Sequence, residues 1–150
     1  MATVIDFSTD AYETIVSHAR EGNPDEICGV LGGERMEVEH TDDEGYVEPG
    51  RASRVRSVHR AANVARNPRH TYLIDPEEQL AIMEDVEESG AEVLGFYHSH
   101  PTGPAQPSGI DERRATWEGY SYVICLPSVP FVESWRWDGE TFTQEIVSVR

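Results

Sequence analysis

Apolar residues recur at helical spacing in two parts of the chain. Positions 11, 15 and 19 are apolar and follow a polar start at Ser8 or Asp10, which predicts a helix to about Arg20. Residues 75–76 (Asp-Pro) form a strong helix start, and the spacing that follows predicts a second helix to about Gly90. One face of that second helix is expected to be apolar: Leu80, Met83 and Val86.

Extended patterns lie between and after these helices. Continuous apolar runs predict buried strands, and alternation of apolar with polar residues predicts strands with one solvent face. The predicted strands are 27–33, 35–40, 54–60, 71–74, 91–97, 121–126, 131–137 and 141–149. Residues 138–139 (Asp-Gly) predict a hairpin turn between the last two strands, and the acidic stretch 41–50 predicts a loop.

The order of these segments predicts the fold class. Helical and extended segments alternate, which is typical of an α/β or α+β layer fold. A third helix is expected from Ser108 or Gly109 to about Trp117. No repeat or linker divides the chain, so residues 1–150 are expected to form one domain.

The charge of the chain narrows the classes of partner. The sequence has 28 acidic and 12 basic residues, a formal charge of −16, and all 12 basic residues are Arg. Such a surface repels phosphate backbones, so nucleic acid is not expected as a partner. Self-repulsion of this size eases as salt screens it, so we expect a salt-loving source with a salt-rich cytoplasm. The alternative is a merely acidic protein.

The sequence indicates neither a membrane protein nor a protein stabilised by disulfide bonds. No stretch approaches the ~20 apolar residues of a membrane span, and the first residues do not resemble a signal peptide, so a soluble cytoplasmic protein is expected. Cys28 and Cys125 lie in apolar runs and are expected to be buried thiols. Because Cys28 lies two residues from Glu26, a catalytic thiol is the alternative.

Two histidines follow the strand predicted at 91–97. In extended chain, residues i and i+2 point to one side, so His98 and His100 share a face at the carboxyl end of that strand. Pro101 cannot continue a central ladder, so the chain is expected to turn away and leave both histidines at an open rim. Alternatively, the pair is only an exposed polar strand end.

Asp111 is the best candidate for a third ligand. The turn-rich segment 102–107 can fold back, and Asp111 then sits on the first turn of a helix that aims its carboxylate at the strand end. Two His and one Asp leave a fourth position for water, which distinguishes catalytic from structural zinc. Taken singly, Ser108 is also explained as a helix cap, Asp111 as a favourable helix-start charge and Glu26 as a surface residue.

Two segments together resemble a known family. Residues 98–111, HSHPTGPAQPSGID, resemble the signature of the JAMM (MPN+) metallopeptidases, and residues 24–33, PDEICGVLGG, resemble the strand that carries their general base. The resemblance extends over nearly the whole chain. It implies a single MPN domain of the JAB1/MPN, cytidine-deaminase-like fold, with a mixed central β-sheet flanked by helices.

The resemblance also implies the role of each site residue. His98, His100 and Asp111 would hold one zinc ion per chain. Glu26 would accept the proton of the attacking water and pass it to the leaving amine, and Ser108 would donate a hydrogen bond to the oxyanion. Asn63 is a possible substrate contact, with a turn-forming Asn as the alternative.

The implied substrates are ubiquitin-like modifier proteins and their conjugates. The expected enzyme is a desampylase-like isopeptidase that cleaves after the Gly-Gly end of small archaeal modifiers of the sulfur-carrier type and releases them from lysines. Three alternatives stay open. They are a peptidase that trims an amino acid from a sulfur-carrier protein, a member of the RadC group, and a non-catalytic MPN scaffold. RadC proteins usually have Asn between the two histidines, where this chain has Ser99.

Overall fold

The computed structural model of the protein describes residues 2–129 and 131–150. In this part of the chain the helices and strands follow one another in this order: β1 (Ala2–Phe7), α1 (Thr9–Gly22), β2 (Cys28–Thr41), β3 (Val47–Ala61), α2 (Pro76–Glu88), β4 (Glu92–Ser99), α3 (Gly109–Arg114), β5 (Ser121–Leu126), β6 (Phe131–Trp137), β7 (Phe142–Gln144) and β8 (Ile146–Val149).

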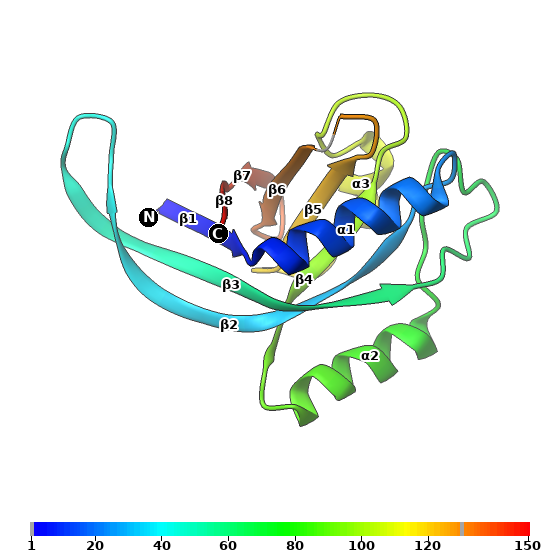
Figure 1. Ribbon diagram of the computed structural model, residues 1–150, viewed down its shortest axis with the longest axis horizontal. Coiled ribbons are helices and arrows are strands. Elements are labelled where there is room, and N and C mark those ends of the chain that lie inside the picture. The colour runs from blue at the N-terminus through cyan, green and yellow to red at the C-terminus, as the bar shows by residue number, and fades with distance from the viewer. Residues whose placement is uncertain (1, 130) are drawn as a thin grey trace.

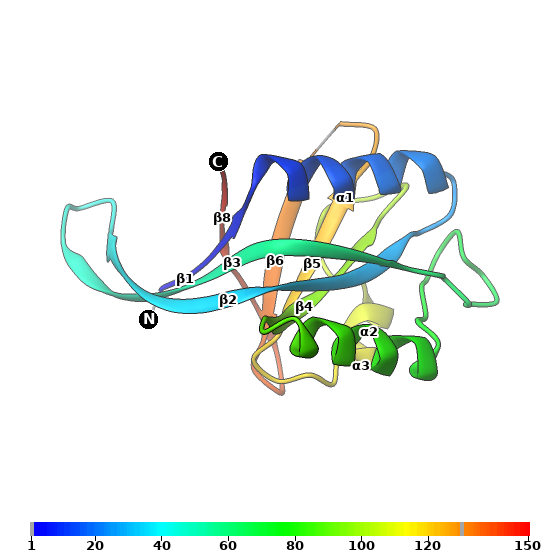
Figure 2. The ribbon, with the colours of Figure 1, turned by 60° about the horizontal axis from the view of Figure 1, so that its bottom comes forward.

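One mixed sheet forms the centre of the molecule. Its strand order is β7-β6-β5-β4-β2-β3-β1-β8, with parallel pairs between β4 and β5 and on both sides of β1. Helix α1 covers one face, whereas α2 and α3 lie on the other (Figure 2). Each face has its own hydrophobic cluster. The expected α/β fold, a mixed sheet flanked by helices, is confirmed.

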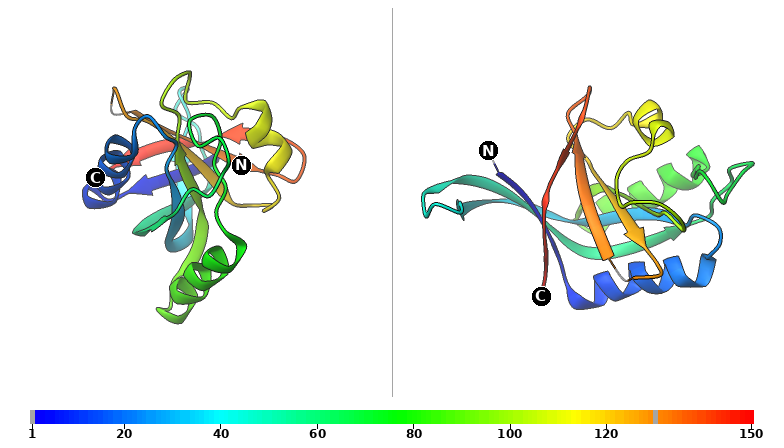
Figure 3. Two further views of the ribbon diagram at one scale, coloured as in Figure 1. Left: turned by 90° about the vertical axis from the view of Figure 1, so that its right-hand side faces the viewer. Right: turned by 90° about the horizontal axis from the view of Figure 1, so that it is seen from above.

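The sheet curls until its two edges approach each other. Strands β7 and β8 are consecutive in the chain but lie at opposite ends of the strand order, and Glu145 is the single residue between them. Its buried carboxylate accepts hydrogen bonds from Ser121 Oγ, Ser134 Oγ and Arg136 Nε, the last at 3.0 Å. This network holds the curled edge against β5 and β6. In the right-hand view of Figure 3, β8 (red) runs beside β6 (orange).

Strands β2 and β3 form a long hairpin that projects from the body (Figure 1). The sequence analysis placed two short strands at 27–33 and 35–40 and a loop at 41–50, and these boundaries were wrong. The ladder shifts register once, between Gly32 and Gly33, and then continues to the pair Thr41↔Val47. Only 42–46 form the turn, where Asp42 Oδ1 accepts the N–H groups of Glu44 and Tyr46 at 2.9 Å. Cross-strand pairing satisfies the backbone and overrides the loop-like composition.

Four further expectations differ from the structure. Strand β1 was not predicted, because its pairing with β3 and β8 is non-local. Residues 71–74 form no strand, since their backbone groups bond to Asn63. The strand expected at 141–149 is split at Glu145, and α3 ends at Arg114 rather than near Trp117. The hairpin turn at 138–139 is confirmed, with Gly139 at φ 101°.

The two longer helices and both cysteines lie largely as expected. Ser8 caps α1, whose buried face includes Ala11, Ile15 and Ala19, and Asp75 caps α2. Met83 and Val86 are buried, but Leu80 is 59% exposed because it borders a cavity instead of the core. Cys28 and Cys125 are buried free thiols. Among the described residues, no helix is long and apolar enough to cross a membrane.

Candidate metal centre and active site

The two histidines converge at the end of β4. His98 pairs with Cys28 of β2 and Ile124 of β5, and His100 follows just beyond the strand. Their Nε2 atoms lie 3.1 Å apart. The expected shared face is therefore confirmed, but the open rim is not: His98 is 1% exposed and His100 is 8% exposed. The segments that follow β3 and β4 cover them.

Helix α3 brings a carboxylate to these imidazoles. Asp111 Oδ2 lies 3.3 Å from His98 Nε2 and 3.1 Å from His100 Nε2. Ser108 and Asp111 form a capping box: Asp111 N–H donates to Ser108 Oγ, and Ser108 N–H donates to Asp111 Oδ2 at 2.8 Å. The cap fixes the direction in which the carboxylate points. Ser108 Oγ acts as an acceptor in the cap, so its hydroxyl hydrogen remains available to donate.

Electrostatics set the protonation states of these three donor groups. Burial alone would raise the pKa of Asp111, but hydrogen bonds from His100, His98 and the Ser108 N–H hold it well below its usual range. Burial lowers the pKa of His98, and the neutral imidazole is the form that binds metal. Asp111 is therefore ionised and His98 is neutral at pH 7. Burial opposes protonation of His100, but its hydrogen bonds to Asp111 and Pro104 O outweigh burial and raise the pKa of this imidazole, so a metal ion would have to displace its proton.

Glu26 lies beside the same two histidines. It lies just before β2, and its N–H donates to Pro68 O at 2.7 Å. One ligand atom each of Glu26, His98 and His100 lies within 4.8 Å of the others. Glu26 is 5% exposed, and its Oε1 is buried without a hydrogen-bond partner among the residues described. Burial raises the pKa of this carboxyl to about 7.

The donor set fits a zinc ion. Ligand atoms about 2.0–2.1 Å from a tetrahedral metal lie roughly 3.3 Å from one another. The three mutual distances among His98 Nε2, His100 Nε2 and Asp111 Oδ2 are 3.1, 3.1 and 3.3 Å. Two imidazole nitrogens and a carboxylate oxygen are the donors that zinc prefers. A carboxylate oxygen of Glu26 also lies within 4.8 Å of a ligand atom of each histidine, so the geometry places Glu26 close enough to serve either as a further ligand or as a base beside the metal.

Asn63 is occupied within the chain. Its Nδ2 donates to Glu26 O at 2.8 Å and to Thr71 O at 3.0 Å, and its Oδ1 accepts the N–H groups of Ala65 and Leu73. Two donors and two acceptors exhaust the amide. Asn63 thus braces the segment between β3 and α2 against Glu26. The substrate contact expected for it stays a prediction.

Two residues near the site were not identified from the sequence. Tyr72 stacks on His98 with ring centroids 4.4 Å apart and an interplanar angle of 23°. Arg114 donates to Tyr72 O at 2.9 Å. Neither lies in a recognisable motif, because their roles depend on a contact between the connecting segment 62–75 and α3. Because Arg114 binds a backbone carbonyl, which every residue has, no pattern of side chains in the sequence marks this contact.

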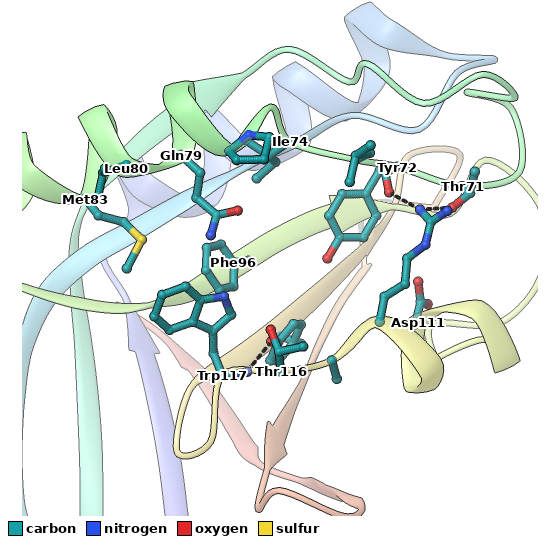
Figure 4. Close-up of a pocket in the computed structure, with 15 residues that line it drawn as sticks. Thr71, Tyr72, Ile74, Gln79, Leu80, Met83, Phe96, Asp111, Thr116 and Trp117 are labelled. Carbon is teal, nitrogen blue, oxygen red and sulfur yellow. Dashed lines mark hydrogen bonds between the residues drawn. The ribbon is translucent and has the colours of Figure 1, made fainter.

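An apolar cavity of about 480 Å³ adjoins the cluster. Asp111 borders both the cavity and the two histidines. Figure 4 shows Met83, Phe96 and Trp117 around the cavity, with Tyr72 and Asp111 toward its other end. An apolar cavity lowers the local dielectric constant, and this strengthens the electrostatic interactions of the neighbouring Asp111 and histidines.

The sequence matches the model of a protein family over residues 8–138, described as prokaryotic homologs of the JAB domain. That match spans most of the chain. The protein belongs to the prokaryotic JAB family. The expected JAB1/MPN fold is therefore confirmed.

Several known proteins resemble the chain over nearly its full length. A desampylase of Haloferax volcanii is 38% identical over 97% of this chain and 96% of its own. A CysO-cysteine peptidase of Mycobacterium tuberculosis is 31% identical over 97% and 91%. A solution structure from Desulfitobacterium hafniense is 30% identical, covers 97% and 92%, and superposes with a TM-score of 0.79.

Proposed function

We propose that this protein is a zinc-dependent isopeptidase that releases ubiquitin-like modifier proteins from their conjugates. The observation that carries the proposal is the convergence of His98, His100 and Asp111 within 3.3 Å, with the unpartnered carboxylate oxygen of Glu26 facing them. The similarity to a desampylase over nearly the whole chain supports the substrate class.

In this proposal His98, His100 and Asp111 hold one zinc ion. Such an ion polarises a carbonyl and lowers the pKa of a bound water to about 7. Glu26, whose pKa burial raises to about 7, takes the proton of the attacking water and later gives it to the leaving amine. The Ser108 hydroxyl donates to the oxyanion while its oxygen continues to cap α3.

The proposed substrates are small archaeal modifiers of the sulfur-carrier type, cleaved after their terminal Gly-Gly. We further propose that the protein works in the cytoplasm of a salt-loving cell. The formal charge of −16 and the absence of Lys support a salt-rich setting.

The test combines activity with metal content. The zinc-loaded protein, in high salt, should release modifiers from conjugates of the same cell. A chelator should stop the release, and added zinc should restore it. Glu26→Gln should lower turnover by about 10²–10⁴-fold because the base is lost, while zinc measured by atomic emission stays bound. Undiminished turnover in that variant would remove Glu26 from the mechanism.

One alternative has support of its own, namely trimming of an amino acid from a sulfur-carrier protein. The similarity to a CysO-cysteine peptidase favours it. The bond cleaved in that case is a peptide bond after the carrier's terminus, and the same side chains would serve. A modifier–cysteine adduct and a modifier–lysine conjugate, supplied at equal concentration, separate the two. Preference for the adduct by kcat/KM would favour the trimming activity.

A further inference from the structure

The two histidines differ in how their second ring nitrogen is held. His100 Nδ1 lies 2.9 Å from the carbonyl oxygen of Pro104, a contact that fixes the ring. His98 Nδ1 is buried and has no hydrogen-bond partner among residues 2–129 and 131–150. A metal-ligating histidine is usually oriented by a hydrogen bond at its other nitrogen. The orientation of His98 therefore depends on another contact.

Tyr72 supplies that contact. Its ring lies nearly parallel to the His98 imidazole, with an interplanar angle of 23° and centroids 4.4 Å apart. The phenol ring also packs against the hydrophobic cluster on the α2 face of the sheet. A flat ring pressed on one face of an imidazole restricts rotation of that imidazole out of its plane.

Helix α3 holds Tyr72 in place. Arg114 Nη1 donates to Tyr72 O at 2.9 Å and to Thr71 Oγ1 at 3.1 Å; the dashed lines near Thr71 and Tyr72 in Figure 4 mark these bonds. Asn63 holds the same segment from its other side through Thr71 O. Because α3 also carries Asp111, one helix sets the position of one proposed ligand directly and of another through Tyr72.

We propose that Tyr72 is a positioning residue for His98, and that Arg114 keeps Tyr72 in that position. The inference rests on the metal-dependent function proposed above. The stacked ring holds the imidazole so that its Nε2 faces His100 and Asp111. Stacking needs the flat ring and not the hydroxyl, so Phe at position 72 would serve and a branched aliphatic side chain would not.

The test compares Tyr72→Leu with Tyr72→Phe. Zinc affinity is measured by competition with a chromogenic chelator, and the visible spectrum of the Co²⁺-loaded protein reports ligand geometry. Leu keeps the site apolar but removes the flat face, so zinc affinity should fall about 10–100-fold, as when an orienting partner is lost. The Co²⁺ spectrum should change with it. Tyr72→Phe should keep both the affinity and the spectrum.

A second pair of variants tests the role of Arg114. Arg114→Ala should weaken zinc binding in the same direction as Tyr72→Leu, but by less, since Asn63 still holds the segment. Arg113→Ala is the matched control, because Arg113 is the exposed neighbour on the same helix. It should bind zinc like the unchanged protein. Melting temperatures of the metal-free variants show whether each is folded.

The outcomes separate the inference from the function on which it rests. If the unchanged protein binds no zinc, the proposed function fails. If it binds zinc but folded Tyr72→Leu has the same affinity and Co²⁺ spectrum, the positioning role is overturned and the function stands. Equal losses in Tyr72→Phe and Tyr72→Leu would also overturn stacking, since the hydroxyl would then be the group that matters.

Discussion

Two serines begin helices in this protein with the same contact. Ser8 Oγ accepts the Ala11 N–H, and Ser108 Oγ accepts the Asp111 N–H, each at 3.1 Å. Only Ser108 lies beside the side chains proposed to bind metal. Comparing Ser8 with Ser108 therefore separates the effect of helix capping on stability from a role in catalysis.

We predict that Ser108→Ala and Ser8→Ala each lower the free energy of unfolding by about 1 kcal/mol through loss of a cap. Ser108→Ala should also slow conjugate cleavage about 10²–10³-fold, because the proposed oxyanion donor is lost. Ser8→Ala should cleave at the normal rate. Urea unfolding and steady-state kinetics measure both effects. Equal rates for the two variants would exclude Ser108 from catalysis.

His18 makes stability depend on pH. Its Nδ1 lies 2.9 Å from the Tyr97 hydroxyl, and burial, followed by the nearby Arg60, lowers its pKa to about 4 from an ordinary value of 6.5. The folded protein thus resists protonation of His18, whereas the unfolded chain accepts a proton below about pH 6.5. The contribution of His18 to stability is present above that pH and is lost as pH falls toward 4.

We predict that the unchanged protein loses about 1–2 kcal/mol more than His18→Gln between pH 6.5 and pH 4, after allowance for solvent screening of this half-buried group. Urea unfolding across this range measures it. His70→Gln, a change at an exposed histidine, is the control and should follow the unchanged protein. Parallel pH profiles for His18→Gln and the unchanged protein would contradict the assignment.

At the residue scale, the sequence identified the groups that converge but not those that orient them. His98, His100 and Asp111 lie in one continuous motif, and their spacing on a strand end and a helix start predicts their meeting. Tyr72 meets His98 across 26 positions of chain, and no local pattern records that contact. The sequence analysis also missed that the segments after β3 and β4 cover the two histidines, because part of this cover comes from residues far away in the sequence.

At the element scale, the decisive feature is the closure between β7 and β8. Glu145 has a fully buried side chain, and its partner Arg136 is 17% exposed. We predict that Glu145→Ala costs about 3–5 kcal/mol, because a largely buried guanidinium and two hydroxyls lose their acceptor. Urea unfolding measures the loss.

The control for Glu145 is an exposed ion pair. Glu34 and Arg56 have side chains 49% and 60% exposed, so Glu34→Ala should cost at most about 1 kcal/mol. A loss for Glu145→Ala no larger than that for Glu34→Ala would show that the closure does not stabilise the fold.

Elements with local signals were the ones that sequence predicted well. Helix α2 begins with Asp75 and Pro76 in their preferred positions, and its start was found to the residue. Strand β1 and the split at Glu145 depend on neighbours far along the chain. Residues 47–49 read as loop by composition, yet they are extended because residues 39–41 lie opposite.

At the scale of the whole molecule, the charge of −16 governs behaviour in salt. Repulsion among the acidic groups weakens as the Debye length falls from about 10 Å at 0.1 M salt to about 3 Å at 1 M. We predict that the melting temperature rises over this range of KCl. The same temperature at both concentrations would count against adaptation to a salt-rich cytoplasm.

A less charged variant is the matched comparison. Glu37→Gln, Asp43→Asn and Glu44→Gln change three exposed positions of the β2–β3 hairpin and bring the charge from −16 to −13, since three negative charges are removed. The melting temperature of this variant should depend less steeply on KCl. An unchanged slope would assign the salt effect to something other than net repulsion.

The parallel pairing of β1 with β8 has a mechanical consequence. The two strands lie side by side, from Val4↔Ile146 to Phe7↔Val149, and Arg150 N–H extends the ladder to Phe7 O at 3.0 Å. A force that draws residue 2 and residue 150 apart therefore slides one strand along the other. All the hydrogen bonds between them must then break together instead of one after another. When residues 2 and 150 are pulled apart, β1 and β8 are therefore loaded in shear, and a high unfolding force is expected. A pull that separates β2 from β3 at the tip of their hairpin would instead unzip the hydrogen bonds one after another, at a low force.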